Sequence, residues 1–187
     1  MFCVVAVVGM SLTPSDAQEF RLGAPVSDFM VSDMTGRPAH YSVLKGTVTV
    51  VIFFSTRCPI SNAFNYRRNK LYNDFKDRVK FIVIDSNSNE SLAEEKEYAR
   101  AVEFDFPVYR DINSVVADRF GALATTDTFV VDASGNLRYH GYLEDSPNPA
   151  RAKHPALRLA IEAVLEGRPV ATPETKPIGC SIRHAKL

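Results

Sequence analysis

"VIFFSTRCPISNAF", Val51 to Phe64, joins an apolar run to the start of a helix, with a single cysteine at the junction. The residues from Thr47 to Ser55 are almost continuously apolar and β-branched, which predicts a strand buried on both faces of a sheet. Pro59 suits a first helical turn, because its missing N–H would have no helical partner there. Three residues after Cys58, where a two-cysteine redox motif would have its second thiol, the chain has Ser61. This stretch therefore predicts a strand that delivers one thiol to a helix N-terminus.

The rest of the chain alternates strand and helix patterns. Alternating apolar and polar residues around Thr35-Gly36 predict a β-hairpin ahead of the buried strand. After the cysteine, Phe64, Leu71 and Phe75 fit one face of a helix. Alternation of this kind predicts an α/β protein with a mixed sheet and helices on both faces. The predicted later elements are a helix over 59–76, a buried strand over 79–85, a helix opened by the capping box of Ser91 and Glu94, a short helix ended by Gly121, a hairpin around 133–136 and a closing helix before Gly167.

Length and charge limit the function classes. The chain has 187 residues, which suits one domain, and neither repeats nor a second domain can be recognised. Its 22 Lys and Arg residues balance 22 Asp and Glu residues, so the sequence predicts no nucleic-acid or anionic-membrane surface. No apolar run approaches the roughly 20 residues that a membrane-spanning helix needs. The sequence leaves the oligomeric state open.

The N-terminal stretch "MFCVVAVVGMSLTPSDA" differs from the rest of the chain. A short apolar segment precedes Ser15 and Ala17, small residues placed as a signal peptidase requires. We therefore predict a leader over residues 1–20 and export to the periplasm or another extracytoplasmic space; the alternative is a disordered or strand-like terminus. Removal of the leader takes Cys3 with it and leaves Cys58 and Cys180. The main domain is predicted over 21–167, followed by a polar tail over 168–187 that lies on the surface.

Four segments carry a resemblance to a known family. They are "LGAPVSDFMVSDMTGRPAHYSVLKG", "VIFFSTRCP", "TFVVDASGNLRYHGYLED" and the tail's "PIGCSI". The chain resembles, over most of 21–167, the redoxin (AhpC/TSA, peroxiredoxin-like) family of thioredoxin-fold proteins, and its tail resembles a secreted subgroup with a Cys-Pro-x-Ser site. The resemblance implies a thioredoxin-like fold: a central mixed β-sheet flanked by helices, with an N-terminal β-hairpin extension. It also implies thiol redox chemistry and an antioxidant role.

Cys58 is the candidate nucleophile. A helix N-terminus carries partial positive charge and N–H groups that can bind a thiolate, so the pKa of a cysteine there is lowered. Arg57 adds a neighbouring cation. Ser61 is the second candidate catalytic residue, either through a hydroxyl bond to the thiolate or as a helix cap. The alternative for Cys58 is an ordinary buried thiol. The predicted substrate groove consists of Ser55, Thr56, Arg57, Pro59 and, from the resemblance, Thr125 and Thr126.

The chain departs from both subclasses that it resembles. Peroxiredoxins have a proline seven residues before the cysteine and a threonine three before, where this chain has Val51 and Ser55. They also have an arginine near the position of Thr126 that polarises the peroxide, and thioredoxin-like reductases have a cis-proline there. Because the cation that would stabilise the transition state is missing, peroxidase chemistry is weakened more than disulfide chemistry.

Cys180 is a candidate resolving cysteine, because a thiol on a C-terminal tail can approach the nucleophile; otherwise it pairs with another chain or stays free. Copper-handling relatives need a second cysteine where this chain has Asn62, together with a distant histidine. We therefore predict no metal site and no cofactor. The polar stretch "DSNSNE" over 85–90 is interpreted as a solvated turn.

Two function classes follow. The first is an oxidoreductase in which Cys58 attacks a disulfide or a hydroperoxide, and an external thiol reductant or Cys180 completes the cycle. The second is a non-catalytic thioredoxin-fold binding module that retains the groove; copper handling is a weaker alternative. The position of Cys58 at a helix N-terminus favours the enzyme.

Overall fold

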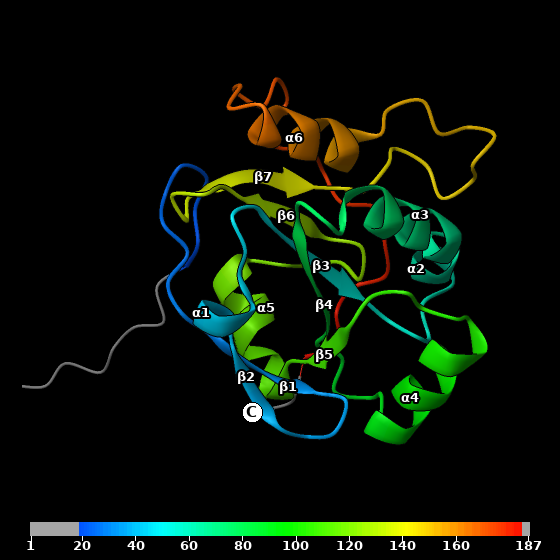
Figure 1. Cartoon of the computed structure of the whole chain (residues 1–187). Helices are drawn as coiled ribbons and strands as arrows, with labels where there is room; N and C mark the ends of the chain where they lie inside the picture. The colour runs from blue at the N-terminus through cyan, green and yellow to red at the C-terminus, as the bar shows by residue number, and fades with distance from the viewer. Residues whose placement is uncertain (1–18, 185–187) are drawn as a thin grey trace, which may run out of the picture.

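A computed structural model describes residues 19–184 (Figure 1). The predicted leader over 1–20 therefore lies almost entirely outside the described residues. The strands form one seven-stranded sheet in the order β2-β1-β5-β4-β3-β6-β7. The strands are β1 (Met30–Asp33), β2 (Pro38–His40), β3 (Thr49–Phe54), β4 (Lys80–Asp85), β5 (Val108–Arg110), β6 (Thr128–Val131) and β7 (Leu137–Gly141). The helices are α1 (Tyr41–Leu44), α2 (Pro59–Asn62), α3 (Asn65–Phe75), α4 (Leu92–Ala101), α5 (Val115–Phe120) and α6 (Ala156–Leu165), with a 3₁₀ turn η1 (Ile112–Ser114).

Strand β3 lies inside the sheet, between β4 and β6. It pairs parallel with β4 and antiparallel with β6, and β4 pairs parallel with β5, so the sheet is mixed as predicted. All six residues of β3 are buried. The near-continuous apolar run is explained by this position, because an inner strand of a sheet covered on both faces has no solvent side.

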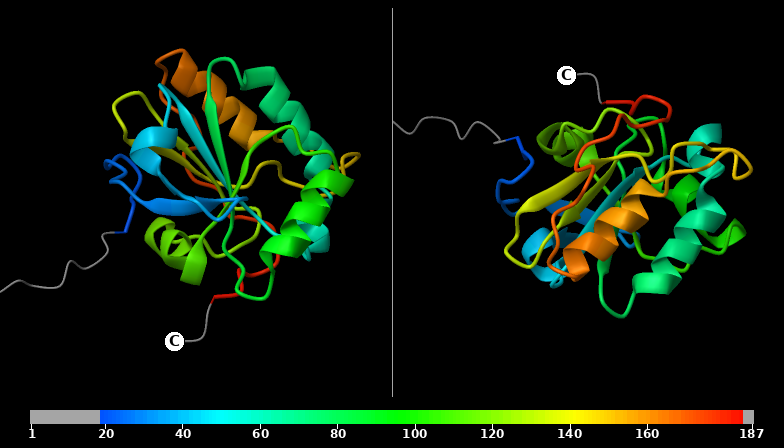
Figure 2. Two further views of the ribbon diagram at one scale, coloured as in Figure 1. Left: turned by 60° about the horizontal axis from the view of Figure 1, so that its bottom comes forward. Right: turned by 90° about the horizontal axis from the view of Figure 1, so that it is seen from above.

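Helices cover both faces of the sheet. On one face, Val50 and Ile52 belong to the core that includes Leu71 of α3 and Ile161 of α6. On the other face, alternate residues of β3 belong to the core with α5, where Phe53 contacts the ring of Phe120. Figure 2 shows α3 and α6 together on one side of the sheet and α5 on the opposite side. The predicted α/β architecture is confirmed.

The helix predicted over 59–76 is interrupted. It divides into α2, a single turn, and α3, with Ala63 and Phe64 between them. The N–H of Phe64 donates to the carbonyl of Ser61 at 3.0 Å, a bond over three residues that tightens the chain at the break. Phe64 is nevertheless 1% exposed, and Leu71 and Phe75 are buried as predicted. The apolar face therefore predicted packing correctly although the helix is not continuous.

The C-terminal tail follows a defined path across the molecule. The N–H of His140 on β7 donates to the carbonyl of Pro173, and the N–H of Thr175 donates back to the carbonyl of His140, both at 2.9 Å. A Cβ on Gly141 would lie 1.9 Å from the hydroxyl oxygen of Thr175, so the tail can approach β7 this closely only at a glycine. Beyond this contact the tail crosses to the loop that precedes β6, as the red segment of Figure 1 shows.

None of the described helices is both long and apolar enough to cross a lipid bilayer.

Candidate active site

Cys58 is the N-cap residue of α2, directly after the loop that follows β3. Its backbone is extended, with φ −87° and ψ 115°, and Pro59 occupies the first helical turn as predicted. The N–H of Ser61 donates to the Cys58 Sγ atom at 3.4 Å. The residue is only 3% exposed. The sulfur therefore lies at the start of a helix but below the protein surface.

Cys58 forms a disulfide with Cys180 of the tail. Their Cα atoms are 6.0 Å apart although 122 positions separate them in the sequence. The tail is also bound by its backbone, because the N–H of Thr125 donates to the carbonyl of Cys180 at 2.9 Å. The N–H of Ile182 donates to the carbonyl of Leu123 at 3.0 Å. The disulfide and the backbone hydrogen bonds, which include an isolated antiparallel bridge between Ala124 and Ser181, hold the tail across the predicted groove.

Thr126 and Gly179 make the closest contact between the groove and the tail. The Thr126 hydroxyl donates to the carbonyl of Ile178 at 2.6 Å. A Cβ on Gly179 would lie 2.8 Å from the Thr126 hydroxyl oxygen and 3.4 Å from the Ala124 Cβ atom. The residue before Cys180 must therefore be very small for the tail to bind in this position.

Ser55 holds the loop that carries the cysteine. Its Oγ atom accepts hydrogen bonds from the backbone N–H groups of Arg57 and Cys58, both at 3.1 Å. The Ser55 hydroxyl in turn donates to Glu90, which also accepts from the backbone N–H of Thr56 at 2.7 Å and from the Thr56 hydroxyl. The guanidinium of Arg57 pairs with Glu94 on α4 and is half exposed. Of the predicted groove residues, Ser55 and Thr56 therefore fix the loop, while the Arg57 side chain is paired with α4.

The prediction that residues 85–90 form a solvated turn holds only for Ser88 and Asn89, which form an exposed turn; the other four residues are buried. Glu90 is 3% exposed, and Asp85, Ser86 and Asn87 are also buried. The Asn87 side-chain amide donates to the carbonyl of Phe54, the last residue of β3, at 3.2 Å. The reason is topological: β3 and β4 are parallel neighbours, so the loops after both strands meet at the same edge of the sheet. The acidic stretch directly after a buried strand was the only sequence signal for this arrangement.

Two carboxyl groups behind the cysteine loop have raised pKa values. Burial raises the pKa of Asp85 to about 9, and repulsion from Glu90 together with a hydrogen bond to it acts in the same direction. Burial also raises the pKa of Glu95 to about 7, against the effect of Arg110, whose Nε atom lies 2.9 Å from a Glu95 oxygen. Asp85 is therefore protonated at neutral pH.

Arg68 of α3 is 1% exposed and lies next to Ser61. Its guanidinium donates to the Ser61 hydroxyl oxygen at 3.3 Å and to the Asn65 side-chain oxygen at 2.9 Å. The Ser61 hydroxyl oxygen also accepts from the N–H of Ser55 at 3.3 Å. Burial lowers the pKa of Arg68 to about 10, so it keeps its charge at neutral pH. The predicted bond from the Ser61 hydroxyl to a Cys58 thiolate stays a prediction, since the sulfur is in a disulfide here.

Among residues 19–184, no group of three or more His, Cys, Asp or Glu side chains is arranged to hold a metal ion. His140 stacks on the ring of Phe129 with centroids 4.4 Å apart, and its Nε2 atom lies 3.1 Å from an Asp127 oxygen. This histidine therefore belongs to the packing of β6 and β7.

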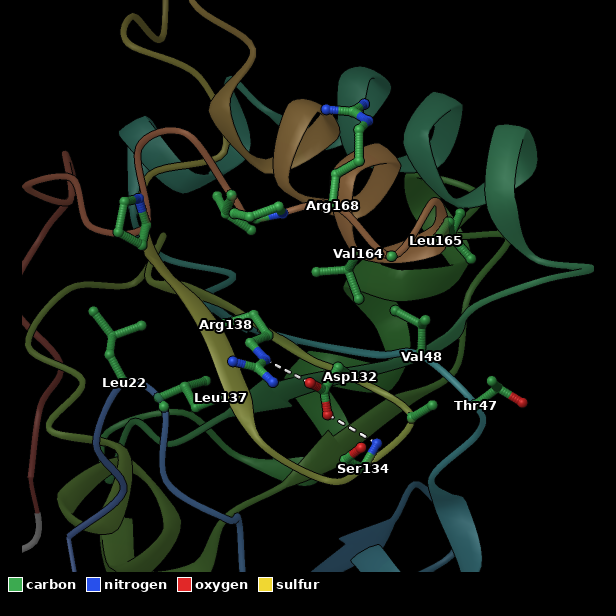
Figure 3. Close-up of a pocket in the computed structure, with 16 residues that line it drawn as sticks. Leu22, Thr47, Val48, Asp132, Ser134, Leu137, Arg138, Val164, Leu165 and Arg168 are labelled. Carbon is green, nitrogen blue, oxygen red and sulfur yellow. Dashed lines mark hydrogen bonds and ion pairs between the residues drawn. The ribbon is translucent and has the colours of Figure 1, made fainter.

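A cavity of about 670 Å³ lies away from the disulfide, between the start of β3, the β6–β7 hairpin and the end of α6 (Figure 3). Its lining includes Val48, Leu137 and Val164. Two arginines also line it, but Arg138 pairs with Asp132 and Arg168 pairs with Glu166. Neither cysteine borders this cavity, so we assign it no part in the redox site.

The fold and the disulfide at the end of β3 define a thioredoxin-fold redox protein. A family profile described as the AhpC/TSA family matches residues 22–140. The chain belongs to this family, which confirms the resemblance noted in the sequence.

Three relatives illustrate the range of similarity. Thiol-disulfide oxidoreductase ResA of Bacillus cereus is 24% identical over 125 residues, which are 66% of this chain and 70% of ResA. A solved structure of an uncharacterized conserved protein from Geobacillus kaustophilus is 28% identical, with a TM-score of 0.82, and the match covers 96% of this chain and 100% of that one. A secreted disulfide oxidoreductase of Mycobacterium tuberculosis shares the fold at 18% identity and a TM-score of 0.58, over 72% of this chain and 95% of that one. The family and the name of the first relative confirm the prediction of an oxidoreductase at this coarse level, and the third relative shows the shared fold.

Proposed function

We propose that the protein is a thiol–disulfide oxidoreductase with Cys58 as the nucleophile and Cys180 as the resolving cysteine. The observation that carries this proposal is the disulfide between them, formed on a tail whose backbone pairs with residues 123–126. The Cys58 sulfur lies at a helix N-terminus and accepts a hydrogen bond from the Ser61 N–H. A disulfide that only stabilised the fold would not need this position, whereas a reactive thiolate does. The name of the ResA relative supports the same chemistry.

The reaction proceeds by two exchange steps. The Cys58 thiolate attacks one sulfur of a substrate disulfide, forms a mixed disulfide and releases a substrate thiolate. The Cys180 thiolate then attacks the Cys58 sulfur, closes the intramolecular disulfide and releases the second substrate thiolate. The substrate gains two electrons and the protein loses two. An external dithiol reductant returns them and restores both protein thiols, and no other cofactor is needed.

A disulfide in an extended polypeptide suits the groove better than a hydroperoxide. The tail supports this choice, because a polypeptide segment with a cysteine binds to Thr125 and Thr126. At the position where a peroxidase would have its arginine, the Thr126 hydroxyl instead binds the carbonyl of Ile178. In this proposal Ser55, Thr56 and Pro59 fix the cysteine loop, and the groove binds the substrate backbone once the tail has moved.

An extracytoplasmic site of action fits this chemistry. Formation of the Cys58–Cys180 disulfide is favoured in an oxidising compartment, and one structural relative is described as secreted. We therefore propose that the protein is exported, which agrees with the leader predicted over residues 1–20.

Variants of the protein without residues 1–20, and therefore without Cys3, test the proposal with one cysteine each. With a fluorescent peptide that contains one disulfide, Cys180→Ser protein should accumulate a mixed disulfide at Cys58, measured as added mass on the intact protein. Cys58→Ser protein should form at least about tenfold less adduct in the same time, since a tail thiol lacks the helix N-terminus. Thiol counting after denaturation checks that each variant retains its remaining cysteine in reduced form.

Two outcomes would contradict this function. Absence of an adduct at Cys58 under conditions that label the denatured protein would leave the binding module as the better description. If hydrogen peroxide closes the Cys58–Cys180 disulfide faster than the peptide disulfide does at equal concentration, peroxide is the substrate instead.

A further inference from the structure

Arg68 carries a buried charge without a carboxylate partner. Among residues 19–184, no Asp or Glu oxygen lies within ion-pair distance of its guanidinium, and its Nε atom has no hydrogen-bond partner. Its charge is met only by neutral oxygens of Ser61 and Asn65 and by the ring of Phe54, 5.9 Å away. An uncompensated charge in the protein interior is costly, so this arrangement requires an explanation.

The neighbouring arginine shows that α3 can pair such a charge. Arg67 forms an ion pair with Glu144, and its guanidinium also donates to the carbonyls of Ser146 and Pro147 at 3.0 and 2.6 Å. The two arginines share a helix and a side-chain type, but only Arg67 has a carboxylate. Arg68 therefore lacks a carboxylate partner because of where its side chain lies, and not because of its helix or its residue type.

That location is one residue away from the Cys58 sulfur, because Arg68 and the sulfur both contact Ser61. Ser61 lies between them: its hydroxyl oxygen accepts from Arg68 at 3.3 Å, and its N–H donates to the Cys58 Sγ atom at 3.4 Å. The Ser61 N–H at the start of α2 already favours a thiolate, but α2 is one turn of four residues and aligns few peptide dipoles, so a full positive charge nearby would add to its effect.

Other charged and titratable groups around the sulfur do not replace Arg68. Arg57 is neutralised by Glu94, and Glu90, which reaches the cysteine loop through Ser55, carries the sign that opposes a thiolate. Tyr98 is linked to Arg68 by hydrogen bonds through Asn65, whose side-chain amide donates to the tyrosine oxygen at 2.7 Å. Asp85, the last residue of β4, and Glu95 of α4 are acidic and add no positive charge.

We propose that Arg68 is the counter-charge of the reduced Cys58 thiolate. When the disulfide opens, the sulfur becomes the anion that this buried guanidinium lacks, and the thiolate is stabilised relative to the thiol. Arg68 acts through space and through Ser61, so it is a positioning residue and not a group that touches the substrate. The inference rests on the proposed role of Cys58. Stabilisation of the reduced form also makes the Cys58–Cys180 disulfide a stronger oxidant.

The test measures how the rate of Cys58 alkylation by iodoacetamide depends on pH, in protein that lacks residues 1–20 and carries Cys180→Ser, so that Cys58 is its one thiol. Arg68→Met should raise the apparent pKa of Cys58 by about one unit, because an opposite charge nearby shifts a pKa by this order. Arg67→Met is the matched control and should leave the pKa unchanged. Arg68→Lys, which retains a positive charge, should restore most of the lowering.

A second measurement uses the protein with both cysteines. Equilibration with glutathione buffers should show that Arg68→Met shifts the dithiol–disulfide equilibrium about tenfold toward the disulfide, since one pKa unit corresponds to a factor of ten. A purely structural role for Arg68 would change the unfolding midpoint without this shift.

The outcomes separate this inference from the proposed function. A low Cys58 pKa that is unchanged by Arg68→Met, in protein whose thermal unfolding shows that it is folded, overturns the role of Arg68 and leaves the function intact. A Cys58 pKa at or above the unperturbed value of about 8.5 in the parent protein contradicts the proposed function itself. If Arg68→Met does not fold, Arg68→Gln replaces it in the test, because the glutamine amide keeps a donor for Ser61 but carries no charge. An unchanged Cys58 pKa in Arg68→Gln protein also overturns the role of Arg68.

Discussion

The two segments that meet in the disulfide are held in different ways. Cys58 is 3% exposed, and its loop is fixed by the buried side chains of Ser55 and Glu90, which accept hydrogen bonds from the backbone N–H groups of residues 56–58. Cys180 is only half-buried, and its segment is held mainly by backbone hydrogen bonds to residues 87–88 and 123–126. The first cysteine is part of the core, whereas the second lies on the C-terminal tail from residue 168 onward. We call this tail the strap.

This difference separates the two properties that a dithiol site needs. The environment of Cys58 can be tuned by buried charges because its position is fixed. The strap can leave and return, because backbone hydrogen bonds at a surface exchange readily with water. We therefore expect changes near Cys58 to alter chemistry and pH dependence, and changes in the tail to alter closure of the disulfide.

The largest effect that we expect is on stability. The disulfide closes a loop with a sequence separation of 122, for which chain entropy predicts stabilisation by about 3–5 kcal/mol. Cys180→Ser should lower the free energy of unfolding in urea by this amount relative to the oxidised protein. Reduced protein with both cysteines is the control and should match the variant; equal stability of all three forms would mean that the strap adds nothing to the fold.

The next effect is a pH dependence that belongs to the Cys58 side. An unfolded aspartate loses its proton near pH 3.9, but Asp85 in the fold keeps its proton up to about pH 9. Between these values the folded state binds more protons, so the free energy of unfolding should fall as pH rises. Asp85→Asn, which keeps the oxygen that accepts from Asn87, should flatten this slope and stabilise the protein at pH 8 by about 1–2 kcal/mol.

Urea unfolding of both proteins at pH 5, 6.5 and 8 measures this difference. Asp145→Asn is a suitable control, because backbone hydrogen bonds lower the pKa of this carboxyl, so it stays ionised across this pH range. A parent protein that becomes more stable between pH 5 and 8 would contradict the assignment of Asp85 as protonated.

The smallest effect concerns the seat of the strap. Gly179→Ala places a Cβ 2.8 Å from the Thr126 hydroxyl oxygen, which should weaken tail binding by about 1 kcal/mol and shift the glutathione equilibrium several-fold toward the dithiol. Lys176→Ala, at an exposed tail position, should leave the equilibrium unchanged. Adding Thr126→Ala should recover part of the loss by removing the contact; a Gly179→Ala protein with the parent equilibrium would show that the tail has another way to bind.

The sequence predicted what depends on local pattern. The buried strand, the cysteine at the helix start and the capping box of Ser91 and Glu94 all have local causes, and the structure contains each of them. The pairing of Cys58 with Cys180 was one of several alternatives, because the distance between segments 122 positions apart is a property of the whole fold.

The missed residues share one cause. Glu90 and Arg68 are charged, and charged side chains are seldom fully buried, so the pattern of residue types favoured an exposed position for both. Glu90 is buried because the loops after two parallel strands lie together, and Arg68 is buried because α3 packs over β3. The periodicity of a single sequence does not predict such contacts between distant segments. The interruption after Asn62 was missed for a related reason, since the buried face of the helix continues across it.

Cys180 is more exposed than Cys58, so the two cysteines should react with different partners. A small thiol that approaches the oxidised protein from solvent meets the half-buried Cys180 before the 3% exposed Cys58. Attack on the Cys180 sulfur expels the Cys58 thiolate, and exchange is faster when the departing thiolate is the more stable one. Electrons would then enter through the strap and leave through the core cysteine, so that donor and acceptor need not compete for one surface.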